Sequence, residues 1–69
     1  MKTSARNHFF GTVKEIAKGP VSAEVTIAVA PGVDIVATIS TRSAEGLALA
    51  AGRPVQALIK ASNVIVAVG

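Results

Sequence analysis

The sequence predicts an all-β fold, a small Greek-key barrel of five strands with one short helix between the third and fourth strands. Hydrophobic residues make up 51% of the 69 residues and aromatic residues only 3%, so valine, isoleucine and alanine supply the apolar mass. These side chains suit closely packed strand faces. Apolar and polar residues also alternate over residues 21–29, which predicts a half-buried strand, and Gly-Pro and Pro-Gly pairs flank this stretch.

The first three strands follow one another along the chain. Residues 7–17 contain spaced apolar side chains, which predict the first strand. Gly11 within this stretch predicts a bulge or sharp bend. Residues 21–29 form the second. Pro31 and Gly32 then fit the central positions of a type II turn. Residues 34–40 are rich in β-branched side chains, so we expect them to be the return strand of a hairpin.

A short helix and two further strands complete the predicted fold. Residues 41–49 begin with hydroxyl side chains that can cap a helix and continue with alanine and leucine, and Gly52 and Pro54 end the helix. Residues 55–61 and 63–68 are the fourth and fifth predicted strands. The last is so apolar that we expect both of its faces to be covered. This order of elements is typical of the oligonucleotide/oligosaccharide-binding (OB) barrel, and residues 1–69 are expected to form one such domain.

The size and composition predict an oligomer. A chain of this length buries only about 60% of its unfolded surface, so its stability as a monomer is marginal. The apolar fraction also exceeds what one small core can hide, and we expect neighbouring copies to cover the excess. The alternative is a monomer with a valine-rich core.

Several classes of protein are disfavoured by what the sequence lacks. It contains no cysteine and only one histidine, His8, so it offers neither a thiolate site nor a multi-histidine metal cage, and a cytoplasmic location is compatible with this. No apolar run reaches the roughly 18 residues that span a bilayer, and no signal-peptide pattern opens the chain, so we expect a soluble protein with no membrane partner. The four acids form no close pair, so we expect no catalytic residues and no enzyme activity.

The net charge of +3 and the pI near 10.0 predict a surface that attracts anions, from nucleic acid to inorganic oxyanions. Three segments concentrate hydrogen-bond donors suited to a small anion. Ser4 and Arg6 stand two residues apart, so on a strand they would project from the same face. Ser40 and Ser43 flank the start of the predicted helix. Lys60, Ala61 and Ser62 lie at the end of the fourth predicted strand and directly after it. Ordinary helix capping for the serines, and surface ion pairs or strand-edge positions for the cations, are the alternatives.

The order of several short motifs resembles the molybdate-binding Mop domain, as found in the small molbindins, over the whole chain. No single piece is specific, but the ordered set is. The pieces are Ser4-Ala5-Arg6-Asn7, Phe10-Gly11-Thr12-Val13, Lys18-Gly19-Pro20-Val21-Ser22-Ala23-Glu24-Val25, Ser40-Thr41-Arg42-Ser43, Gly46-Leu47-Ala48-Leu49-Ala50-Ala51-Gly52 and Leu58-Ile59-Lys60-Ala61-Ser62.

The resemblance implies two types of oxyanion site in a homo-hexamer, a trimer of dimers, that stores molybdenum in the cytoplasm. The first type lies between two protomers, and its predicted residues are Ser4, Arg6, Ser40, Ser43, Lys60, Ala61 and Ser62, with Ser43 supplied by the second protomer. The second type lies near a three-fold axis and uses Lys18, Gly19, Pro20, Val21 and Ser22, largely through main-chain N–H groups. Pro20 has no N–H to donate, and a simple strand-connecting turn is the alternative for this segment. Neither site coordinates a metal ion directly.

The donor set predicts which anions are accepted. Part of the phosphate population near neutral pH keeps a proton that needs an acceptor, whereas molybdate and tungstate need only donors, so phosphate is disfavoured and tungstate is accepted with molybdate. The rival hypothesis from another class is an OB-type nucleic-acid-binding module. Such modules stack bases on aromatic side chains, and this sequence has only Phe9 and Phe10, so nucleic acid is the less favoured partner.

Overall fold

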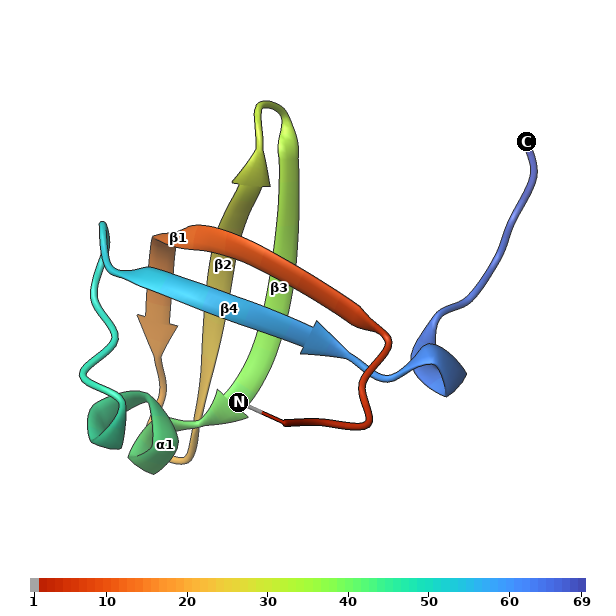
Figure 1. Ribbon diagram of the computed structural model, residues 1–69. Coiled ribbons are helices and arrows are strands. Elements are labelled where there is room, and N and C mark those ends of the chain that lie inside the picture. The colour runs from red at the N-terminus through yellow and green to blue at the C-terminus, as the bar shows by residue number, and fades with distance from the viewer. Residues whose placement is uncertain (1) are drawn as a thin grey trace.

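The computed structural model describes residues 2–69, which contain one antiparallel sheet of four strands (Figure 1). The strands are β1 (Asn7–Lys18), β2 (Ser22–Ala30), β3 (Val33–Ser40) and β4 (Pro54–Ile59). Helix α1 (Thr41–Gly46) lies between β3 and β4, and a 3-10 turn, η1 (Ala61–Asn63), follows β4. The sheet order β3-β2-β1-β4 is that of a Greek key, because the fourth strand returns to lie beside the first.

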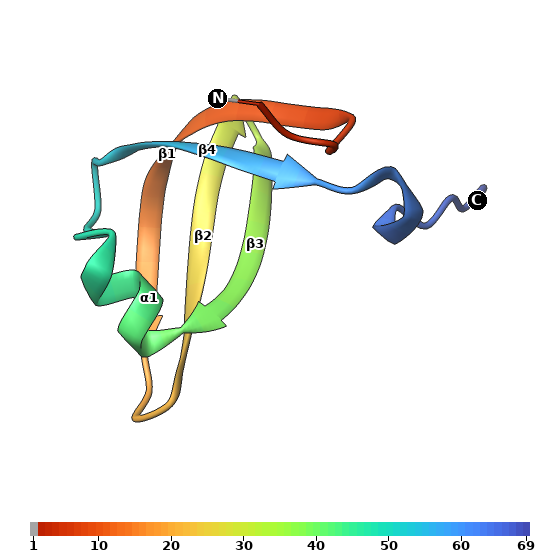
Figure 2. The same ribbon diagram turned by 60° about the horizontal axis from the view of Figure 1, so that its bottom comes forward.

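The sheet curls because β1 is long and takes part in two ladders. Residues 12–18 of β1 pair with β2, and residues 7–12 pair with β4. The register with β2 shifts between Val13 and Glu15, and such a bulge bends a strand. Figures 1 and 2 show the first half of β1 and the whole of β4 crossing over β2 and β3. In residues 2–69 no ladder joins β3 to β4, so the sheet is a four-stranded half-barrel and not the five-stranded barrel expected.

The expected irregularity of β1 lies near Gly11 but not at it. Gly11 pairs regularly with Val55, and the register shift follows two residues later. A Cβ atom at Gly11 would lie 2.5 Å from the carbonyl oxygen of Ala28 and 2.9 Å from Cγ2 of Ile27. Glycine is therefore needed at this position because the curled sheet brings β2 against the backbone of β1.

The β2–β3 hairpin follows the prediction closely. Gly32 has φ +73°, which a type II turn requires at its second central residue. The alternation is also confirmed, with Ala23, Val25 and Ile27 buried. Val21 is different, because it precedes β2 and is 78% exposed, so the strand starts one residue later than expected.

Helix α1 ends at Gly46, three residues before the predicted end. The N–H of Leu49 donates to the carbonyl of Ala44, and the N–H of Ala48 donates to that of Glu45, both at 3.0 Å. These two bonds form a Schellman motif, which terminates a helix. Alanine and leucine favour helix, but Leu49 packs against the core instead, and this tertiary contact outweighs the local propensity.

Replacing Ala48 by glycine is expected to stabilise the protein by about 0.5–1 kcal/mol. Ala48 has φ 52°, and this left-handed conformation costs a residue with a Cβ atom roughly 1–2 kcal/mol. Glycine avoids this cost, but it loses more conformational entropy on folding, which offsets part of the gain. Urea unfolding at a fixed protein concentration measures the difference. Ala50→Gly is the control, because Ala50 has no positive φ, and there the substitution should give no gain.

The core is small, and much apolar surface lies outside it. Val13, Val25, Ile27 and Ala57 form the buried cluster, with partly buried aliphatic side chains packed around it. Exposed large apolar residues occur in β1, β3 and β4 and outside the strands: Phe9, Phe10, Val21, Val33, Val36, Leu47, Leu58, Val64, Ile65, Val66 and Val68. The expected surplus of apolar surface is thus present, while oligomerisation stays a prediction.

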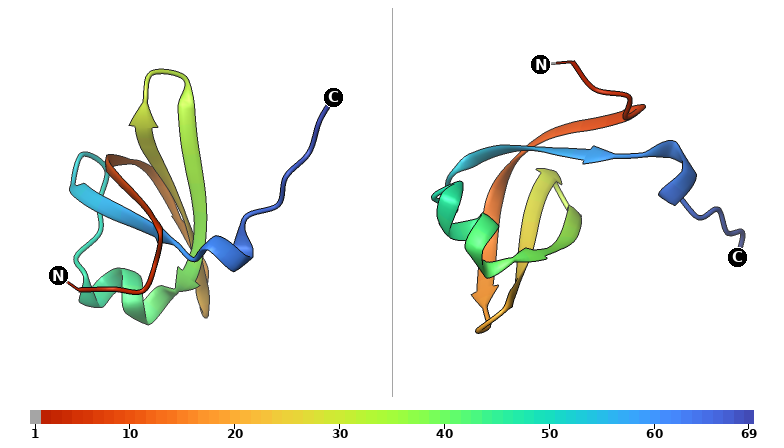
Figure 3. Two further views of the ribbon diagram at one scale, coloured as in Figure 1. Left: turned by 45° about the vertical axis from the view of Figure 1, so that its right-hand side comes forward. Right: turned by 90° about the horizontal axis from the view of Figure 1, so that it is seen from below.

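The prediction of a fifth strand over residues 63–68 is wrong for the single chain. Asn63 belongs to η1, and residues 64–68 have no ladder partner and project away from the sheet (Figures 1 and 3). A strand needs a neighbouring strand for its main-chain groups, and η1 directs this segment away from both sheet edges. In residues 2–69 no helix has the length and hydropathy needed to cross a membrane.

Candidate functional site

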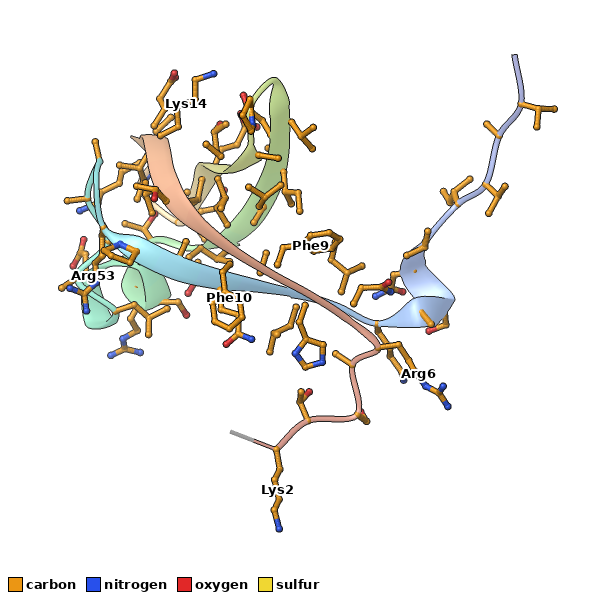
Figure 4. The ribbon with its side chains drawn as sticks, turned by 45° about the horizontal axis from the view of Figure 1, so that its top comes forward. Lys2, Arg6, Phe9, Phe10, Lys14 and Arg53 are labelled. Carbon is orange, nitrogen blue, oxygen red and sulfur yellow. The ribbon has the colours of Figure 1, made fainter. Side chains whose placement is uncertain are left out.

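One end of the β1–β4 ladder brings two cationic side chains together. Asn7 pairs with Ile59 across the ladder, and its Nδ2 atom donates to the Ile59 carbonyl at 3.1 Å. Arg6 precedes this pair and Lys60 follows it. Figure 4 shows Arg6 beside the end of β4 and the start of η1. Segments far apart in the sequence thus form one basic end of the sheet, as predicted.

Ser4 and Arg6 do not lie on a strand, which corrects the expectation that they share a strand face. β1 begins only at Asn7, and both residues occupy bends before it. The N–H of Ala5 donates to Thr3 Oγ1 at 3.1 Å, and His8 Nε2 lies 2.8 Å from the Ala5 carbonyl oxygen. These local bonds pair polar groups within the loop, and the side chains of Ser4 and Arg6 remain exposed.

Lys60 also lies outside a strand, because β4 ends at Ile59 and not at residue 61. It is the N-terminal capping residue of η1, and Ala61 and Ser62 lie within that turn. All three residues are exposed. A lysine after the strand, unlike one within it, does not compete with core packing, so its ammonium group is available to a ligand.

The charges around this end are of one sign. No acidic residue precedes Glu15 or follows Glu45 in the sequence. Within the described part of the chain, the single ion pair joins Lys14 Nζ to Asp34 Oδ2 at 2.9 Å. The hydrogen bond from Lys14 to Asp34 raises the pKa of the Lys14 amine above its usual value. Lys14 is therefore satisfied by a carboxylate, while Arg6 and Lys60 have no such partner in residues 2–69.

Ser40 and Ser43 form a capping arrangement at the start of α1. Ser40 Oγ accepts the N–H of Ser43 at 3.0 Å and donates to Ser43 Oγ at 2.8 Å. This is the N-cap geometry that was the alternative interpretation of these serines. Both side chains are exposed, and Ser43 Oγ uses its acceptor capacity toward Ser40, so its own proton remains available to an anion.

Ser40→Ala is expected to destabilise the protein by about 1 kcal/mol, whereas Ser40→Gly should cost only a few tenths, because glycine replaces an N-cap residue better than alanine. Chemical unfolding without any oxyanion measures both. A Ser40→Ala variant as stable as the parent would show that the cap contributes nothing to folding.

The turn between β1 and β2 lies against the start of α1 (Figure 2). Thr41 Oγ1 donates to the Gly19 carbonyl at 2.7 Å, and the Thr41 N–H donates to the Val21 carbonyl at 2.9 Å. Thr41 was not among the predicted site residues, and its hydroxyl at the helix start joins this turn to α1. The Gly19 N–H donates to the Ser22 carbonyl at 2.8 Å, so this turn has few free main-chain donors, since Pro20 has none.

The two donor clusters lie apart within one chain. Figures 1, 2 and 3 all place α1 near the start of β4 and η1 beyond its end. Ser4, Arg6, Lys60, Ala61 and Ser62 are therefore grouped at one end, while Ser40, Ser43 and the segment 18–22 are grouped at the other. A single chain brings together only part of each predicted set.

Comparison with known proteins identifies one family and several similar solved structures. The family described as the TOBE domain matches residues 3–66. The chain is 46% identical over 69 residues to the molybdenum-pterin-binding protein MopA of Rhodobacter capsulatus, covering 100% of this chain and 26% of that protein. It thus spans about a quarter of the length of several curated relatives.

Two of the similar solved structures each have a TM-score of 0.90 with this chain. A molybdate-binding protein from Sporomusa ovata is 42% identical, with 97% of this chain and 98% of that chain covered. The cytoplasmic molybdate-binding protein ModG, in a form with molybdate bound, is 45% identical, with 94% of this chain and 46% of that chain covered. The OB-like half-barrel with its short helix is therefore shared with proteins described as binding molybdate.

Proposed function

Because the chain belongs to the TOBE domain family, we propose that it binds molybdate without catalysing a reaction and contributes to the storage and homeostasis of molybdenum in the cytoplasm. The observation that supports this most strongly is the similarity to the Sporomusa ovata molybdate-binding protein, which extends over nearly all of both chains. The ModG structure contains molybdate itself. Sequence identity of 42–45% over a shared fold supports assigning the same class of ligand to this chain. The residues at the basic end provide hydrogen-bond donors suited to an oxyanion.

The first proposed oxyanion site is centred on the basic end of the β1–β4 ladder. A tetrahedral dianion offers four oxygens that accept hydrogen bonds, so its site needs many donors and no competing carboxylate. Arg6 and Lys60 are exposed, and they adjoin the Asn7–Ile59 pair on the two strands. Ser4, Ser62 and the main-chain N–H of Ala61 add neutral donors.

The rest of the first site is proposed to come from a second protomer. Ser40 and Ser43 lie at the start of α1, near the start of β4, whereas Arg6 lies near the other end of β4. We propose that an approaching copy brings its own α1 against the basic end. The exposed apolar surface supports such association. We propose a homo-hexamer arranged as a trimer of dimers, in which these sites lie at subunit interfaces.

A second, weaker type of site is proposed at the turn formed by Lys18, Gly19, Pro20, Val21 and Ser22. Its exposed lysine and serine can face an anion near a three-fold axis. The Gly19 N–H is already used inside the turn and Pro20 has none, so fewer main-chain donors remain than the family resemblance implies. We therefore expect the second type to bind more weakly than the first.

Isothermal titration with molybdate, after the oligomer has been sized, tests the proposal. We expect tight uptake of molybdate and tungstate and little heat from phosphate, because the protonated oxygen of phosphate finds no acceptor among these donors. More than one anion per two chains would support both types of site. Equal heats from molybdate, sulfate and phosphate, or no heat from any, would reject the storage function.

The nucleic-acid hypothesis has one observation in its favour, the 78% exposure of Phe10. Phe9 and Phe10 are neighbours on β1, so they point to opposite faces and cannot form one stacking platform. Binding of single-stranded oligonucleotides with a steep salt dependence, in the absence of molybdate binding, would favour this hypothesis instead.

A further inference from the structure

Two donors of the first proposed site lie on a segment that is not part of the sheet. Residues 3–6, which we call the N-terminal loop, precede β1 and belong to no helix or strand. Ser4 and Arg6 of this loop are exposed, whereas Ala5 between them is half-buried. Figure 4 shows Arg6 extending outward where the loop enters β1. A site that surrounds a small anion with several donors depends on whatever holds such a loop in place.

His8 connects the N-terminal loop to the sheet. It lies on β1 opposite Leu58 of β4, so the ladder fixes its backbone. Its Nε2 atom is 2.8 Å from the carbonyl oxygen of Ala5. A carbonyl oxygen can only accept a hydrogen bond, so Nε2 must carry the proton that is shared with it.

The other ring nitrogen faces a group that suits the same tautomer. In a neutral imidazole with its proton on Nε2, Nδ1 is an acceptor. The side-chain amide nitrogen of Gln56, which is a donor, lies 3.5 Å from Nδ1 of His8. Gln56 belongs to β4, so groups from both the loop and the neighbouring strand orient the ring.

The bond from His8 holds the N-terminal loop at the point between its two donor side chains. The peptide that joins Ala5 to Arg6 is planar and trans, so a fixed Ala5 carbonyl also fixes the direction of the Arg6 N–H. The N–H of Ala5 donates to Thr3 Oγ1 at 3.1 Å and closes the loop on itself. The exposure agrees with this arrangement, because Ala5 is turned inward and the residues on either side of it are turned outward.

We propose that His8 is a positioning residue for oxyanion binding and holds the N-terminal loop in its binding conformation before the anion arrives. The inference rests on the proposed function, because the loop supplies Ser4 and Arg6 to the first site. His8 does not need to contact the anion, since both of its ring nitrogens face protein atoms. A loop that is already ordered loses less conformational entropy on binding, and this raises the affinity.

Two amide substitutions separate this role from a general effect of changing the residue. The amide nitrogen of glutamine is as many bonds from Cβ as Nε2 of histidine, so His8→Gln retains a donor for the Ala5 carbonyl. The amide nitrogen of asparagine is one bond closer to Cβ, so His8→Asn loses this bond. Isothermal titration should show molybdate binding about 3- to 10-fold more weakly to His8→Asn, the effect of one hydrogen bond, and within about twofold of the parent to His8→Gln.

The order of the N-terminal loop provides a second measurement that needs no ligand. NMR order parameters of the Ala5 and Arg6 amides, measured without oxyanion, should be about 0.85 in the parent and His8→Gln and should fall toward about 0.6 in His8→Asn. His8→Val also lacks the donor but favours a strand, so it should show the same two losses if they do not arise from poor folding of the asparagine variant.

Phe10→Leu is the matched control. Phe10 is exposed and lies two residues beyond His8 on β1, on the same face of the strand, and its side chain has no hydrogen-bonding group. This substitution should change neither the molybdate affinity nor the order of the loop. Losses equal to those of His8→Asn would overturn the inference, because they would report a general disturbance of β1.

The two measurements distinguish failure of the inference from failure of the proposed function. If the parent binds molybdate and His8→Asn and His8→Val keep both its affinity and its loop order, the inference fails alone. A loop that loosens in these variants without any loss of affinity would also overturn the role of His8 in binding. If the parent binds no molybdate, the proposed function fails, and the order parameters still decide whether His8 holds the loop.

Discussion

Molybdate is expected to bind about 10- to 100-fold more weakly when Arg6 is replaced by alanine. The guanidinium donates in a planar fork, and a hydrogen bond to a charged group contributes about 1.5–3 kcal/mol, of which about 1.4–2.8 kcal/mol corresponds to this range of affinity. Arg6 has no carboxylate partner among the described residues, so its substitution removes little from the folded protein. Lys60→Ala should show a loss of the same order. Isothermal titration with molybdate measures both.

Two cationic residues of the same chain provide matched controls. Arg53 is exposed and precedes β4, at the opposite end of that strand from Arg6 (Figure 4). Lys14 is exposed and pairs with Asp34. Arg53→Ala and Lys14→Ala change the net charge by the same amount, so they should reduce molybdate affinity only by weakening the general attraction for anions. Losses equal to that of Arg6→Ala would show that charge alone, and not the basic end of the β1–β4 ladder, accounts for binding.

Gly11→Ala is expected to destabilise the fold by about 3 kcal/mol or more, at the upper end of the cost of overpacking. Its Cβ atom would lie 2.5 Å from a main-chain oxygen of β2, and a main-chain atom cannot move aside as the end of a flexible side chain can. Relief requires β1 and β2 to separate where the sheet curls. Urea unfolding at one fixed protein concentration measures the loss, because oligomerisation makes stability depend on concentration.

Gly46→Ala is the matched control for this substitution. Gly46 is the last residue of α1, and a Cβ atom there would meet nothing within 4 Å. Alanine is the better helix former, so the variant should be as stable as the parent or more stable by up to about 1 kcal/mol. If Gly11→Ala unfolds at the same urea concentration as the parent, the close approach of β1 and β2 does not constrain this position.

Local patterns predicted the features whose causes are local. The type II turn at Pro31 and Gly32 needs one residue with positive φ, and a glycine directly after a proline predicts such a turn. The alternation of Ala23, Val25 and Ile27 follows from the period of a strand, and the capping serine marks the start of α1. The donor segments around Arg6 and Lys60 were also predicted to come together, and the pairing of Asn7 with Ile59 does this.

The end of the helix and the shape of the sheet depended on contacts between distant residues. Leu49 leaves the helix because the core accepts its side chain, although the sequence around it favours helix. Gly11 was expected to form a bulge. Instead, its lack of a side chain allows the backbone of β2 at Ala28 to approach β1 closely, and Ala28 is more than a dozen residues away in the sequence. Ser4 and Arg6 lie before β1 because a strand can extend only as far as its partner, and β4 ends opposite Asn7.

The sequence by itself determined the all-β class, the short helix between the third and fourth strands, the surplus of apolar surface and the choice of donor side chains, whereas the fifth strand that it predicted is absent from the single chain. These properties depend on residue type and periodicity, which are present in the chain before it folds. The tertiary structure decided that the barrel stays open between β3 and β4, that residues 64–68 extend outward, and that the serines of α1 lie apart from Arg6. The physical reason is that a strand or an anion site exists only where separate segments meet. Strand-forming propensity does not specify the sheet edge with which a segment will pair.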